Sequence, residues 1–198
     1  TSSTSSGAIT QYSNTIGAVT ADSVEALTLS TPGQSVTALS TALTTGAISA
    51  DAAETLTISV GAKETMTTGV IDTADDLAFT VNVTLNDDSA LVLGDGVDAD
   101  LDLGDSDVDT MTITMGVGTS LSGTDSSPSS TTDVDIVADT IADFTMTIGA
   151  ASSADISLKA GVTGSITASA GSSLDMVVVG VTGEDTDLTI SGRGELND

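Results

Sequence analysis

The stretch 54–58 reads Glu54-Thr55-Leu56-Thr57-Ile58, and variants of this phrase recur along the chain. An acidic residue is followed by an alternation of apolar residues with threonine. Alternation with a period of two places the apolar side chains on one face of a strand and threonine on the other, and threonine is itself a good strand former. The phrase therefore predicts a short, half-buried β-strand. It returns, in strict or looser form, at residues 25–29, 76–81, 109–113, 143–148 and 187–190.

The spacing of these phrases predicts how the strands are arranged. Successive phrases are about 23 to 44 residues apart, which is the span of one solenoid coil. Glycine-bearing turns such as Val60-Gly61 follow the strands. Only Tyr12, Phe79 and Phe144 are aromatic, so the core is built from small aliphatic residues and methionine, which suits a narrow stack of similar layers. We therefore predict an all-β fold, a parallel β-solenoid (β-helix or β-roll) of short Thr-rich strands, with an antiparallel β-sandwich as the alternative.

The domain organisation follows from composition. Residues 1–7 are almost entirely Ser and Thr and predict a flexible N-terminal lead-in, while residues 8–198 predict a single elongated solenoid domain. Residues 125–132, rich in Ser around Pro128, are where that domain would divide into two blocks. The longest apolar run, residues 176–179, is strand-sized, so we expect no membrane insertion. The chain starts without Met or a basic-apolar leader, which is typical of a mature or trimmed product.

The charge balance excludes several classes of function. Twenty-nine acidic residues face three basic ones, giving a formal net charge of −26, and histidine and cysteine are absent. Without histidine no serine has its usual activating base, and the scarcity of aromatic rings argues against a sugar-cleaving site. We therefore expect no enzyme activity and no catalytic residues. The negative charge opposes binding to nucleic acid or anionic lipid and leaves divalent cations as partners.

The densest acidic segment spans residues 94–109, where Asp alternates with Gly and apolar residues. Calcium takes about six to eight oxygen ligands, which carboxylates and backbone carbonyls on tight turns can supply. The segment resembles the calcium loops of the RTX (repeats-in-toxin) exported proteins, although the doubled glycine of that family is missing and its nonapeptide period does not continue. The alternative is an acidic turn that only solubilises a sheet edge. As a calcium site, it would draw its ligands from Asp95, Asp98, Asp100, Asp102, Asp105, Asp107 and Asp109.

The composition of the whole chain, rich in Thr, Ser, Ala, Gly and Asp, resembles that of surface-layer and related exported matrix proteins. This resemblance implies secretion, calcium-dependent ordering and self-association. The end coils of a solenoid also carry unpaired strand edges, which invite stacking on another copy. We therefore expect a structural, self-assembling protein of the extracellular space or cell surface, a surface-layer or filament subunit whose main partner is itself.

A binding module is the rival expectation, either an adhesin, a viral fibre segment or an ice-binding solenoid. Thr-x-Thr recurs, as in Thr112-Ile113-Thr114 and Thr145-Met146-Thr147. Ranks of outward threonines that stack in register over several coils can order water and bind ice. The uneven intervals between the phrases predict instead that these threonines do not stack in register.

Overall fold

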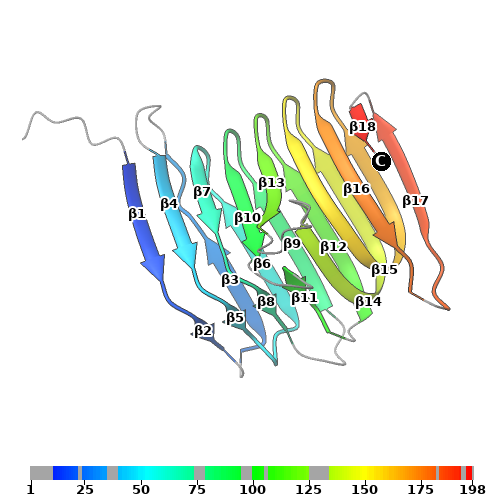
Figure 1. Cartoon of the computed structure of the whole chain (residues 1–198), viewed down its shortest axis with the longest axis horizontal. Coiled ribbons are helices and arrows are strands. Elements are labelled where there is room, and N and C mark those ends of the chain that lie inside the picture. Colours follow the sequence, from blue (N-terminus) through cyan, green and yellow to red (C-terminus); the bar gives the residue numbers. More distant parts are fainter. Residues whose placement is uncertain are drawn as a thin grey trace, which may run out of the picture.

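The computed structural model describes residues 11–21, 24–34, 40–73, 79–94, 100–104, 107–124, 134–181, 183–192 and 195–197. Within these ranges the chain forms an 18-stranded sheet that is coiled into a solenoid, with its coils stacked along the long axis from β1 at one end to β17 and β18 at the other (Figure 1). Each strand pairing is parallel. The predicted parallel β-solenoid is therefore confirmed, in preference to the antiparallel sandwich. No helix in the described part is long and apolar enough to cross a bilayer.

The strands stack in three columns, which we call faces A, B and C, and each coil visits them in that order. Face A is formed by strands β1 (Gln11–Ile16), β4 (Ser40–Thr45), β7 (Glu64–Thr67), β10 (Ala90–Gly94), β13 (Ser120–Thr124), the start of β15 (Ser153–Ala168), β16 (Ser173–Val179) and β18 (Glu195–Asn197).

Face B carries the shortest strands, and face C carries the recurring phrase. Face B consists of β2 (Val19–Thr20), β5 (Ile48–Ser49), β8 (Ile71–Asp72), β11 (Leu101–Asp102), the first part of β14 (Val134–Ile148), and the segments of β15 and β16 paired beside it. Face C consists of β3 (Ala26–Ser30), β6 (Thr55–Val60), β9 (Phe79–Leu85), β12 (Asp107–Met115), the ends of β14 and β15, and β17 (Asp187–Gly192).

The coils differ in length, yet their strands stay in register. A coil spans 20 residues between the paired Ser153 and Ser173, but 33 between Ser120 and Ser153. Corner loops absorb the difference, so the Thr-x-Thr pairs stack directly on one another: Thr112 pairs with Thr145, and Thr114 with Thr147. The expectation that uneven intervals would put the threonines out of register was therefore wrong.

The core is a set of apolar ladders running along the inside of the solenoid. On face C one ladder is continuous through five coils, and each of its members is at most 4 % exposed. Each such side chain contributes about 1.5–3 kcal/mol on burial. The buried aromatic residues Phe79 and Phe144 lie in the same core, both at 0 % exposure. The five ladder residues are Ile58, Val83, Ile113, Met146 and Ile166.

Candidate functional surfaces

Three of the seven candidate calcium ligands, Asp95, Asp98 and Asp105, lie outside the described residues. Of the other four, Asp100 is buried at 3 % exposure, and its Oδ2 accepts a hydrogen bond from the Asp135 backbone N–H at 3.2 Å. The Asp100 backbone N–H in turn donates to the Asp135 carbonyl at 2.9 Å. This carboxylate therefore ties one coil to the next.

The remaining three candidates point outward. Asp102 is half-buried on face B, and its Oδ1 accepts from the Gly104 backbone N–H at 3.0 Å. Asp107 accepts from the Thr140 hydroxyl at 2.6 Å, and Asp109 is exposed at the register irregularity between β12 and β9. Among the described residues, no group of three or more acidic side chains is arranged to hold a metal ion. Calcium binding by this segment stays a prediction.

A stack of tight turns forms the corner where each coil passes from face C to face A. Lys63, Asp88, Gly118 and Ala151 have positive φ angles of 63°, 58°, 69° and 56° at the equivalent point of successive turns. The backbone N–H of each of the first three donates to a carbonyl of the next turn: Lys63 to Asp87 at 3.0 Å, Asp88 to Val117 at 2.8 Å, and Gly118 to Ala150 at 3.0 Å. Repetition of this left-handed conformation lets the corners nest.

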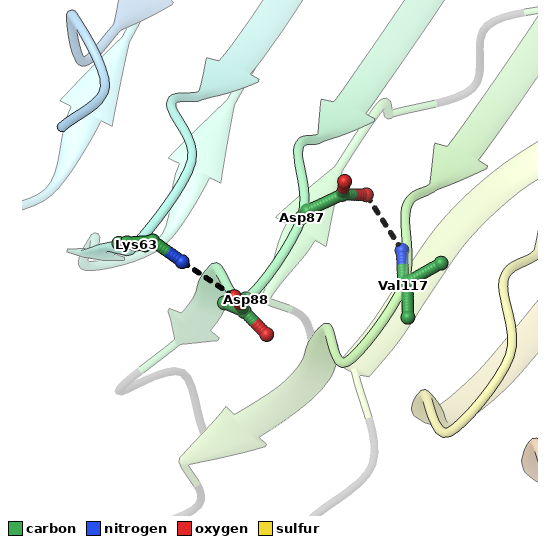
Figure 2. Close-up of polar contacts among 4 residues, drawn as sticks. All are labelled: Lys63, Asp87, Asp88 and Val117. Atoms are coloured by element: carbon green, nitrogen blue, oxygen red, sulfur yellow. Dashed lines mark hydrogen bonds and ion pairs between the residues drawn. The ribbon is translucent and has the colours of Figure 1, made fainter. Parts of the chain in front are cut away.

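Side chains reinforce the same corner stack (Figure 2). Lys63 Nζ lies 2.7 Å from Asp88 Oδ2, and Asp87 Oδ1 accepts a hydrogen bond from the Val117 backbone N–H at 2.9 Å. Both contacts join one coil to the next. They lie directly before β7, β10 and β13, and so support the register of these three strands of face A.

The outward side of face C carries two ranks of hydroxyl-bearing residues, which we call the hydroxyl ranks. Each rank runs through seven paired strands, from β3 to β17, with one residue per strand. Thirteen of the fourteen positions are Thr or Ser, and the remaining one is Asn82. The first rank is Thr28, Thr57, Asn82, Thr112, Thr145, Ser165 and Thr189; the second is Ser30, Ser59, Thr84, Thr114, Thr147, Thr167 and Ser191.

The two ranks form a regular two-dimensional array. Neighbouring strands lie about 4.8 Å apart, and alternate residues on one strand lie about 6.6 Å apart. The register shifts of face C fall between Val108 and Thr110 and between Ile141 and Phe144, outside the ranks. The array is therefore uninterrupted over all seven strands.

Comparison of the chain with protein-family models, with curated proteins and with solved structures gives no match. Function therefore has to be inferred from the surfaces described above. The expectations of export, of a cell-surface location and of a chain without a catalytic site stay predictions.

Proposed function

We propose that the protein is a self-assembling structural rod of the extracellular space or cell surface, a subunit of a surface layer or filament. The observation that carries this proposal is the exposure of apolar side chains at the two end coils. Ile190 continues the buried ladder of face C, but it is 44 % exposed. At the other end Ile16, which pairs with the buried Thr45, is 49 % exposed.

The strand edges at the ends support the same proposal. Among the described residues β1 pairs only with β4, and β17 only with β15. Each of these strands therefore has one edge without a strand partner in the described chain, and such an edge is a template for pairing with another chain. A second copy stacked on the end coil would continue the apolar ladders inside and the polar rows outside.

The geometry of this contact favours a filament. One end coil presents the edges of β1 to β3 and the other those of β16 to β18, so the two surfaces that meet are different. A contact between two different surfaces propagates from copy to copy unless its rotation closes a ring.

Calcium is part of the proposal because assembly brings highly charged copies together. Copies carrying −26 each repel one another, and this repulsion has to be screened or bridged before the ends can meet. Extracellular calcium modules bind with dissociation constants of about 0.1–1 mM. The proposal thus places assembly where divalent cations are plentiful.

The test compares two variants of the edge strand β1 by light scattering and negative-stain electron microscopy. Ile16→Lys places an inward-facing charge on the edge, a device that blocks edge pairing, whereas Thr15→Lys places the same charge on the outward side of the same strand. Wild type and Thr15→Lys should form large particles in CaCl2 that a chelator dissolves, and Ile16→Lys should stay monomeric. Circular dichroism checks that both variants fold. A wild-type chain that stays monomeric in calcium at all concentrations would overturn the proposal.

A further inference from the structure

The hydroxyl ranks are uncharged, although the chain as a whole is strongly acidic. No acidic or basic residue stands at any of their fourteen positions. The acidic residues Asp109 and Asp187 of face C stand outside the ranks, near the starts of β12 and β17. The outward positions of face B include Asp72, Asp102 and Lys159, and those of face A include Asp155 and Asp175. Charged groups orient their own hydration shells, so a surface without them leaves its water free to follow the pattern of the hydroxyls.

The hydroxyls of the ranks are also largely unused within the protein. In the described chain, the side-chain hydrogen bonds of rank members are a contact at 3.4 Å between Thr167 and Ser191, and one at 3.3 Å from Ser191 to the Ile166 carbonyl. The other rank hydroxyls make no bond to the described protein, and those of Thr114, Thr145 and Thr147 are exposed. Their hydrogen-bonding capacity is left for solvent.

Most of the side chains that hold these hydroxyls are threonines and therefore stiff. Threonine is β-branched, and its restricted χ1 keeps the hydroxyl and the methyl group in a defined direction. A surface that is already ordered loses little conformational entropy when it binds. Over six strand spacings the array is about 29 Å long, which is enough for many equivalent contacts.

From these observations we propose that face C binds ice through the hydroxyl ranks. The repeats of about 4.8 Å and about 6.6 Å are of the size of the oxygen spacings on the faces of an ice crystal. Rank hydroxyls would hold a layer of water in this pattern, with the threonine methyl groups confining it, and the layer would merge with the crystal surface. A crystalline polysaccharide is disfavoured as the occupant because no rank position carries an aromatic ring on which a sugar could stack. The proposal does not depend on self-assembly.

The experiment measures thermal hysteresis and inhibition of ice recrystallisation with the purified full chain. Thr147→Lys places a long charged side chain in the second rank, near the middle of the array. Ser153→Lys makes the same change at an exposed position of face A in the following coil. We expect wild type and Ser153→Lys to be active. The thermal hysteresis of Thr147→Lys should be lower by about tenfold or more. Thermal unfolding checks that the variants fold equally well.

Two further measurements distinguish ice binding from self-assembly and from binding to a polysaccharide. Ile16→Lys, which leaves face C unchanged, should keep ice activity as a monomer even where assembly is lost. Pull-down on crystalline chitin or cellulose identifies a polysaccharide surface instead. The inference is overturned if wild type shows no hysteresis, if Thr147→Lys retains it, if Ser153→Lys loses it equally, or if the chain binds the polysaccharide without acting on ice.

Discussion

Phe144 and Gly164 are neighbours in the parallel register between β14 and β15, and a Cβ built on Gly164 would lie only 2.0 Å from the Phe144 carbonyl oxygen and 2.7 Å from its Cβ. At this point of the core one coil carries the largest side chain and the next carries none. The equivalent positions of earlier coils hold aliphatic side chains of ordinary size, at Leu56, Val81 and Met111.

Gly164→Ala should therefore destabilise the protein, although it adds only a methyl group. Because the contact is with backbone, the coils have to move apart, and we expect a loss of about 1–3 kcal/mol in the free energy of unfolding. Urea unfolding measures it. Gly17→Ala is the control, since its Cβ would meet nothing within 4 Å, and it should be neutral or stabilise by up to about 1 kcal/mol. Equal effects of the two changes would contradict this packing.

The number of coils could not be predicted from the sequence, and the coil that contains Gly164 shows why. The alternation of apolar residues with threonine is local, so it predicted the parallel solenoid. The coil at Gly164 lacks both the acidic residue and the first apolar residue of the phrase, so the phrase does not identify it. The longest interval, from residues 143–148 to 187–190, therefore contains two coils, as the pairing of Thr145 with Ser165 and of Ser165 with Thr189 shows.

The surfaces were harder to predict because they depend on which residues meet across coils. The stacking of the hydroxyl ranks requires that corner loops absorb the differences in coil length, and no local pattern reveals this. The contact of Lys63 with Asp88 joins residues 25 apart in the sequence. Within the acidic segment all seven aspartates look equivalent, yet Asp100 is buried and bonded to Asp135, while Asp109 is exposed.

Neighbouring residues on β12 should respond very differently to truncation. Ile113 is 2 % exposed within the core ladder, whereas Thr114 points outward in the second hydroxyl rank. Ile113→Ala should cost about 2–5 kcal/mol, because it leaves a cavity, and Thr114→Ala should change stability by no more than about 0.5 kcal/mol. Chemical denaturation of both variants checks the assignment of inner and outer sides. A larger loss at Thr114 would mean that the strand faces the other way.

The stability of the corner stack should depend more on the hydrogen-bond acceptor at Asp87 than on the charge of its carboxylate. Asp87→Ala removes the acceptor of the Val117 N–H and should cost about 1 kcal/mol. Asp87→Asn keeps an oxygen at the same place and removes one of many negative charges, so its stability should equal or exceed that of the wild type. Thermal unfolding at low and high salt distinguishes the two variants. If both lose equally, the carboxylate charge is what matters at this corner.

The salt and calcium responses should be separable. Because the net charge is −26, added NaCl should raise the thermal midpoint by screening self-repulsion. If the acidic segment binds calcium with a dissociation constant of about 0.1–1 mM, 10 mM calcium adds about 1.4–2.7 kcal/mol of stability. Magnesium at the same ionic strength should add less, because it demands stricter geometry and gives up its water reluctantly.

Replacing Asp102, Asp107 and Asp109 together by Asn tests where that calcium increment arises. The change should abolish the difference between the stabilising effects of calcium and magnesium. The fold should be kept, since asparagine retains the acceptor oxygens that Asp102 and Asp107 use. The NaCl response should remain, because most of the negative charge is still present. The matched control makes the same change in charge on exposed carboxylates elsewhere, and it should retain the calcium increment. An increment that survives in the first triple variant would assign the calcium to other carboxylates of the chain. The control replaces Asp143, Asp175 and Asp185.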